Sequence, residues 1–446
     1  MNHNAQAIQQ WLDDHHITEV ECLIPDMTGL ARGKIVPRHK YNPAEGLRLP
    51  EAVLSMTVTG DYPEQDFTAV SDPDMRLIPD ASTIRPVPWA KEPTAQIIHD
   101  CVNFDGTDAD LAPRNVLKRI LKLYEQQDLS AIVAPEMEFY LVEVQPDEDI
   151  PLRPPVGRTR RTEAGMQSFS IDAVNEYDDV FDVMYDWCEA QGLALDTLIH
   201  EMGTAQMEIN LDHGDPLALA DQVFLFKRTV REVAIRNNMY ATFMAKPMQG
   251  QPGSAMHIHQ SVVDADGRNI FSQADGSPSD AFLHFIGGLQ TYLPAAMPFF
   301  APYVNSYRRL SRFTSAPINL SWGYDNRTCG LRVPHSGPEA RRVENRLAGV
   351  DVNPYLAMAA SLACGYLGMQ QRIAPSEPLT GSAYEQPHQL PRHLDDAIDT
   401  LLKCQPLAEI FGEHFIQTYG AIKEAEYREY FDVISPWERR FLLLHV

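Results

Sequence analysis

Residues 134–140 read Ala134-Pro135-Glu136-Met137-Glu138-Phe139-Tyr140 and lie within the apolar stretch Ala131 to Val142. The stretch predicts a strand, in which Glu136 and Glu138 at i and i+2 point to the same face. Two close carboxylates are costly to bury unless cations neutralise them, and hard carboxylate oxygens suit Mg²⁺ or Mn²⁺. The segment therefore favours a metal site, with two solvated acids on an edge strand as the alternative.

Two further segments supply side chains of the same kind. Residues 200–210 carry Glu201 and Glu208 on either side of a Gly-Thr turn, where both could face one ligand. Residues 253–259, Gly253-Ser254-Ala255-Met256-His257-Ile258-His259, place two imidazoles at strand spacing. A neutral imidazole could complete a carboxylate-rich metal site. Taken alone, each pattern is also typical of solvated glutamates or structural histidines.

The segment Arg341-Arg342-Val343-Glu344-Asn345-Arg346 gives the sharpest signal. As a strand it would align Arg342, Glu344 and Arg346 on one face, an alternation of charge that suits a phosphate beside a metal. The chain supplies further planar donors for carboxylate or phosphate at Arg309, Arg327 and Arg332. Exposed arginines are common on soluble proteins. This chain, however, has a net charge of -24 and still concentrates arginine in one stretch, and that contrast favours an anion site.

The N-terminal quarter of the chain predicts a small, mostly β domain. Residues 5–15 have helical spacing of apolar side chains, and residues 18–25 predict a strand that leads into a turn at 26–29. From Arg32 to about residue 105 the sequence mixes Pro and Gly with short β-prone runs, such as residues 52–54 and 57–59.

A larger domain of alternating helices and strands is predicted to follow. Helices are expected at residues 113–127, 177–192, 217–237 and 279–297. The predicted fold is α+β, with domains at 1–108 and 109–446. No GxxxxGK[ST] loop is present, so any ATP site must be built another way.

Composition excludes several classes of partner. A net charge of -24 argues against non-specific binding to nucleic acid or to an anionic membrane. The six cysteines have no spacing typical of zinc or disulfides, and no signal peptide is evident. The apolar run 353–369 is rich in Ala and too short to span a bilayer comfortably, so it predicts a core helix. We expect a cytoplasmic protein that binds neither nucleic acid nor membrane.

In this order the segments resemble the glutamine synthetase family, from the N-terminal strand to Asn353-Pro354-Tyr355-Leu356. Residues 71–80 also resemble part of the family's N-terminal domain. The resemblance implies a β-grasp-like N-terminal domain, a glutamine-synthetase-like catalytic domain, ATP and two divalent cations. It also implies a ring-shaped homo-oligomer, a dodecamer, whose active sites lie between subunits.

The resemblance further implies a role for each candidate residue. Glu138, Glu201 and Glu208 would hold one metal ion, and Glu136, His257 and Glu344 would hold the other. Arg309, Arg346 and the backbone at Gly253 would bind glutamate. Arg327, Arg332 and Arg342 would face the phosphates during transfer, and His259 would lie near the nucleotide.

Three departures from the family pattern concern the ammonium site. Ser315 stands where an acid usually precedes Ala-Pro, Pro252 replaces an Asn, and an N-terminal Asp has no clear counterpart, although Asp61 is near. The implied activity is ATP-dependent joining of the glutamate γ-carboxylate to a polyamine or monoamine, as in the γ-glutamylpolyamine synthetases. The alternatives are glutamine synthetase using ammonia and a non-catalytic structural protein of the same fold.

Overall fold

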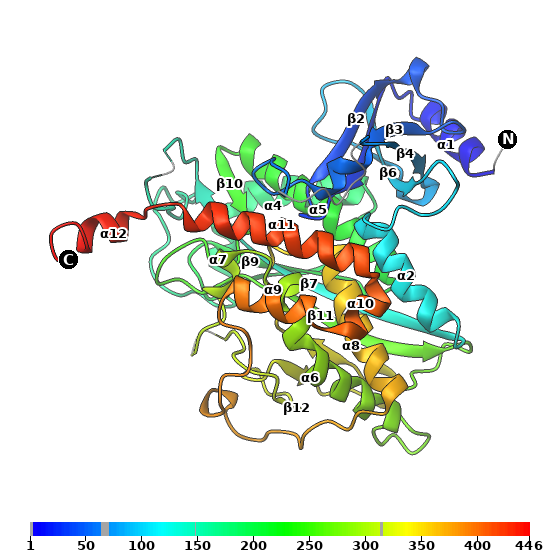
Figure 1. Ribbon diagram of the computed structural model, residues 1–446. Helices are drawn as coiled ribbons and strands as arrows, with labels where there is room; N and C mark the ends of the chain where they lie inside the picture. Colours follow the sequence, from blue (N-terminus) through cyan, green and yellow to red (C-terminus); the bar gives the residue numbers. More distant parts are fainter. Residues whose placement is uncertain (1–2, 64–70, 148, 313–314) are drawn as a thin grey trace.

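The computed structural model describes residues 3–63, 71–147, 149–312 and 315–446. Within these ranges helices and strands mix in an α+β arrangement with two sheets, as predicted. The smaller sheet belongs to the N-terminal part and lies at one end of the molecule (Figure 1). The larger sheet lies in the body of the molecule, beside a layer of helices.

The N-terminal sheet is organised around β6, which pairs in parallel with β1 and antiparallel with β4 and β5. Its strands are β1 (Glu19–Pro25), β2 (Ala31–Pro37), β3 (Leu47–Pro50), β4 (Asp74–Pro79), β5 (Arg85–Pro86) and β6 (Thr94–Val102). Helix α1 (His3–Asp14) packs Ile8 and Leu12 into the core beneath this sheet. The helix, first strand and turn predicted for residues 5–29 are confirmed.

Two β-prone runs in this region do not form strands. Residues 52–54 lie in a 3-10 helix, Glu51–Ser55. Residues 57–59 lie in a turn in which the Thr57 amide donates to the Asp61 carbonyl at 2.8 Å and the Asp61 amide donates to the Thr57 hydroxyl at 3.0 Å. Local bonds of this kind compete with strand pairing. The same predicted β segment contains residues 64–70, which lie outside the described residues.

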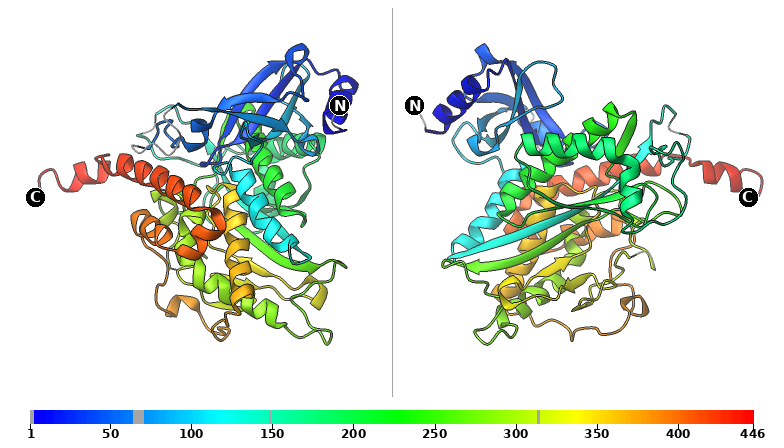
Figure 2. Two further views of the ribbon diagram at one scale, coloured as in Figure 1. Left: turned by 45° about the vertical axis from the view of Figure 1, so that its right-hand side comes forward. Right: turned by 180° about the vertical axis from the view of Figure 1, so that it is seen from behind.

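The strand predicted at residues 131–142 is β7, and it lies near the centre of the larger sheet. Its order is β12-β13-β14-β11-β7-β9-β8, and β10 also pairs with β7. The rear view in Figure 2 shows β7 and β11 running side by side. The strands are β7 (Leu129–Glu143), β8 (Leu195–His200), β9 (Gln206–Leu211), β10 (Met239–Thr242), β11 (Met256–Asp264), β12 (Trp322–Tyr324), β13 (Leu331–Val333) and β14 (Val343–Asn345).

Helices cover the apolar face of this sheet, with α2 and α5 on β7 and α8 against α2, α5 and α6. Helix α8 confirms the predicted core helix. A Cβ added at its Gly368 would lie 2.5 Å from the Gly288 Cα atom, so glycine allows α6 and α8 to approach closely. The helices are α2 (Pro113–Glu125), α3 (Ile171–Val174), α4 (Asp178–Ala190), α5 (Pro216–Arg236), α6 (Asp280–Phe300), α7 (Val304–Tyr307), α8 (Pro354–Gln371), α9 (Leu394–Leu402), α10 (Gln405–Phe411), α11 (Glu413–Phe431) and α12 (Pro436–Phe441).

A buried cation joins the N-terminal sheet to the helices. Arg114, on α2, donates to Asp221 on α5 at 3.0 and 2.9 Å and to Asp80 at 2.7 Å. It also donates to Asp100 on β6. Its side chain is only 2% exposed, so these carboxylates provide its charge compensation in place of water.

Within the described ranges, none of the helices combines the length and the apolar character that crossing a membrane requires. All six cysteines lie within those ranges and carry free thiols. The predicted division between residues 108 and 109 falls in the connection between β6 and α2 and stays a prediction.

Candidate active site

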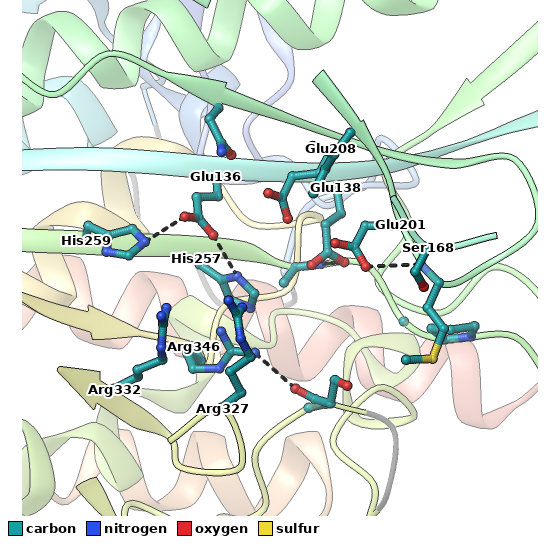
Figure 3. A pocket seen from close by; sticks show the side chains of 18 of the residues that line it. Glu136, Glu138, Ser168, Glu201, Glu208, His257, His259, Arg327, Arg332 and Arg346 are labelled. Carbon is teal, nitrogen blue, oxygen red and sulfur yellow. Dashed lines mark hydrogen bonds and ion pairs between the residues drawn. The ribbon is translucent and has the colours of Figure 1, made fainter. Parts of the chain in front are cut away.

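The predicted ligands meet on one face of the larger sheet, because its register sets them opposite one another. Paired residues on neighbouring strands are Glu138 with Glu208, Glu136 with His257, and His259 with Glu344. Met137 and Phe139, which alternate with the two glutamates along β7, face the opposite side of the sheet and are fully buried in the core. Figure 3 shows the carboxylates and imidazoles gathered above a row of arginines.

A cavity of about 540 Å³ opens over this face. All but one of the predicted site residues line it: Glu136, Glu138, Glu201, Glu208, Gly253, His257, His259, Arg309, Arg327, Arg332, Arg342 and Arg346. The remaining residue, Glu344, is fully buried beside them. A second cavity of about 640 Å³ shares Glu136, His259 and Arg342 with the first.

Glu138, Glu201 and Glu208 form a carboxylate cluster, each offering an oxygen within 4.8 Å of the others. Burial, together with repulsion from neighbouring carboxylates, raises the pKa of Glu138 to about 8 and that of Glu208 to about 9. Burial also raises the pKa of Glu201. A divalent cation would relieve this repulsion, and an all-oxygen donor set fits Mg²⁺ or Mn²⁺.

Glu136 is shared by two histidines. Its carboxylate lies 3.3 Å from His257 Nδ1 and 2.7 Å from His259 Nε2. Burial alone would raise the pKa of Glu136, but hydrogen bonds with the two imidazoles outweigh it and hold the pKa well below its usual value. His257 Nδ1 also lies 3.7 Å from Glu344 Oε1.

These contacts bring the predicted second ligand set, Glu136, His257 and Glu344, together around one imidazole. The donor atoms within 4.8 Å of one another also give two other groupings, Glu136 with Glu208 and His257, and Glu136 with His259 and Glu344. Carboxylate oxygens with one imidazole nitrogen fit Mn²⁺ or Mg²⁺. The choice of ligands for a second ion stays a prediction.

The arginines surround Glu344. Arg332 donates to its Oε2 atom at 2.7 Å, and Arg346 donates to its Oε1 atom. Burial would raise the pKa of Glu344, but the Arg346 guanidinium and then His259 and His257 lower it to about 2. Arg342 donates from Nε to His259 Nδ1 at 3.2 Å, so the predicted charge alternation along residues 342–346 is part of one connected network.

Backbone carbonyls of Arg346 and of the residue that follows it hold the Arg309 side chain. Its guanidinium donates to the carbonyls of Arg346 and Leu347, both at 2.9 Å. Burial lowers its pKa to about 10. A Cβ at Gly253 would lie 2.5 Å from Arg309 Cγ, so glycine is needed where this loop passes the arginine. The predicted glutamate-binding residues are thus adjacent in space.

Two of the three departures from the family pattern lie at the main cavity, and the third does not. Ser315 and Pro252 both line the cavity. The Ser315 carbonyl accepts from Arg346 at 3.3 Å, and the Pro252 carbonyl accepts from the Tyr140 hydroxyl at 2.9 Å. Asp61 instead lines a separate hollow beside α11. Within one chain, Asp61 is therefore not part of the main cavity.

Sequence reasoning missed several residues of the site. Gln206 donates to Glu138 at 3.1 Å and to the Gly253 carbonyl at 3.0 Å, and its spacing of two from Glu208 on β9 could have revealed it. Ser168, Phe169 and Met202 also line the cavity. They come from irregular segments, where no periodic pattern marks which side chains face a ligand.

Comparison with known proteins finds relatives that match nearly the whole chain. Residues 110–442 match the family described as glutamine synthetase, catalytic domain. Gamma-glutamylputrescine synthetase PuuA from Escherichia coli is 33% identical over 448 residues, 98% of this chain and 94% of that protein. Glutamate–isopropylamine ligase from a Pseudomonas species is 30% identical over 448 residues, 97% of this chain and 96% of that protein. A solved structure of a GmaS/ADP complex superimposes with a TM-score of 0.86 at 28% identity, covering 98% of this chain and 99% of that one.

Proposed function

Because this chain belongs to the glutamine synthetase family, we propose that it is an ATP-dependent ligase that joins the γ-carboxylate of glutamate to an amine. The observation that carries the proposal is the convergence of a carboxylate cluster and a set of arginines on one cavity. The two similar ligases, named for putrescine and isopropylamine, support an amine as the acceptor. Intact metal-binding and phosphate-binding sets argue against a purely structural role.

The chemistry requires two transfers. A carboxylate is a poor electrophile, so a γ-carboxylate oxygen first attacks the terminal phosphorus of ATP, and ADP departs with the electrons of the broken P–O bond. The amine nitrogen then attacks the acyl carbon of γ-glutamyl phosphate. Inorganic phosphate leaves, the nitrogen loses a proton, and the amide remains. Both reactants must be held close together, which is the purpose of a pre-formed cavity.

Each group of residues has a task in this sequence. When bound, divalent cations at the carboxylate cluster would neutralise the triphosphate and the charge that develops during transfer. Arg309 and Arg346 would hold the α-carboxylate of glutamate. Arg327, Arg332 and Arg342 would face the transferred phosphate. The adjoining cavity that shares His259 provides space for the nucleotide.

Ser315 supports an amine larger than ammonia. An ammonium ion must lose water and a proton before it attacks, and nearby carboxylates help both steps. Ser315 provides neither charge nor an effective base, although it lines the cavity. Burying the hydrocarbon part of a larger amine contributes roughly 0.8 kcal/mol of binding free energy per CH₂. That binding energy can position the nitrogen for attack.

Phosphate release by the metal-loaded enzyme tests the function. Glutamate, ATP and an acceptor are combined, with isopropylamine, putrescine or ammonium as the acceptor. We expect alkyl amines to exceed ammonium in kcat/KM. Ser315→Glu should shift the ratio toward ammonium, and the uncharged control Ser315→Ala should not. Ammonium as the best acceptor of the wild-type enzyme would instead identify a glutamine synthetase.

The proposal extends to assembly and location. We propose a ring-shaped homo-oligomer, a dodecamer, in which a neighbouring subunit completes each active site. Its support is the resemblance and the position of Asp61 outside the cavity of its own chain. The six free thiols support a cytoplasmic protein. The division into domains at 1–108 and 109–446 belongs to the same proposal.

A further inference from the structure

The two ends of the main cavity differ in chemistry. His259 and Arg332 lie on one side of the carboxylates, and Ser168 lies on the opposite side (Figure 3). The apolar end is formed by Phe169, next to Ser168 in the chain, and by Ile199 and Met202, which lie close to the His200 carbonyl that accepts from the Phe169 amide. An anionic nucleotide suits the basic end. The apolar end suits a hydrocarbon group.

Phe169 is the unusual member of the apolar end. Its backbone has a φ of 61°, in the left-handed region that bulky residues rarely adopt. Its side chain is 69% exposed, so the ring contributes little to the core. Stability therefore explains neither the strained backbone nor the aromatic side chain. Such conformations persist mainly at ligand-binding and active sites.

Hydrogen bonds hold Phe169 in place relative to the carboxylate cluster. Its amide donates to the His200 carbonyl at 2.8 Å, beside Glu201. Earlier in the same segment, the Glu163 carboxylate lies 3.0 Å from His200 Nε2 and accepts from the Ala205 amide at 2.7 Å. The backbone of Phe169 is thus tied to the loop that carries Glu201 and Met202, and its side chain lines the cavity beside them.

Building on the proposed function, we propose that Phe169, with Ile199 and Met202, binds the hydrocarbon part of the acceptor amine. The ring selects the acceptor by contact with its alkyl group. The nitrogen then points toward the centre of the cavity, where glutamate is activated. Ammonia gains nothing from this contact, because it has no hydrocarbon part.

The test compares Phe169→Ala with Ile171→Ala in the metal-loaded, full-length enzyme. Ile171 is a matched control, because it is 71% exposed two residues away and does not line the cavity. Glutamate-dependent phosphate release is measured with isopropylamine, putrescine and ammonium. Loss of an apolar contact changes discrimination by roughly 10- to 200-fold. We therefore expect Phe169→Ala to lower kcat/KM for isopropylamine at least about tenfold.

Two further comparisons complete the expected result. In Phe169→Ala, kcat/KM falls much less with ammonium than with isopropylamine, while the melting temperature stays close to that of the wild type. Phe169→Leu, which keeps an apolar side chain, recovers part of the isopropylamine activity.

Several outcomes would overturn the inference. An equal loss with isopropylamine and ammonium would mean that Phe169 only maintains the fold of the site. No loss, or the same loss in Ile171→Ala, would remove Phe169 from the acceptor site. Absence of phosphate release with every acceptor would refute the proposed function itself, and this inference with it.

Discussion

Replacing Arg114 with Met should destabilise the protein by about 3–5 kcal/mol, the usual cost of leaving buried carboxylates without their cation. Arg114 is 2% exposed and donates to Asp80, Asp100 and Asp221, which come from the N-terminal sheet region and from α5. Methionine fills much of the same volume, so the loss of stability measures mainly the effect of removing the positive charge. The matched control is Arg268→Met, because Arg268 also pairs with two aspartates but is 73% exposed.

Urea unfolding followed by tryptophan fluorescence, at one protein concentration, measures the effect. The control should unfold close to the wild type, because exposed ion pairs contribute little. Burial raises the pKa of Asp221 and Arg114 opposes that rise, so removing Arg114 raises it further. The folded variant then binds more protons than the unfolded chain, and its stability relative to the wild type falls as pH increases. A loss below about 1 kcal/mol that does not change between pH 5 and pH 8 would refute the reasoning.

Three other predictions concern the site and the assembly. Glu138→Ala and Glu344→Ala should each abolish glutamate-dependent phosphate release while leaving the circular dichroism spectrum unchanged, and wild-type-like activity in either would exclude a two-metal site. The pKa values of Glu138 and Glu208, about 8 and 9, imply that Mg²⁺ must displace protons when it binds. The affinity for Mg²⁺ should therefore rise from pH 7 to pH 9, with proton release detectable by calorimetry, and pH-independent binding would contradict this. Light scattering should find a homo-oligomer, and an active monomer would exclude shared active sites.

The fold and most of the site could be predicted where side chains repeat with a regular period. Glu136 and Glu138 follow the two-residue period of β7, and the helices follow their own apolar spacing. The β-prone runs at residues 52–54 and 57–59 do not form strands, because a 3-10 helix and a local turn outweigh their β-propensity. Phe169 could not be found in this way, since its position depends on a backbone bond to His200 that sequence spacing does not encode.

Only the structure shows which residues from distant segments of the chain lie next to one another. The register that sets Glu138 beside Glu208 and Glu136 beside His257 is not visible in the sequence. Nor is the choice of partners for Glu344, which contacts Arg332 and Arg346 as well as His257. Resemblance to a family supplied the expected roles of these residues, and the structure supplied their distances.

The most direct test of the account follows an oxygen atom from glutamate. Glutamate labelled with ¹⁸O in its γ-carboxylate is supplied with ATP, Mg²⁺ and isopropylamine, and the products are analysed by mass spectrometry. If the γ-carboxylate attacks ATP, each phosphate released carries one ¹⁸O atom and an equal amount of γ-glutamyl amide forms. Phosphate without ¹⁸O, or phosphate formed without amide, would contradict the proposed acyl-phosphate ligase.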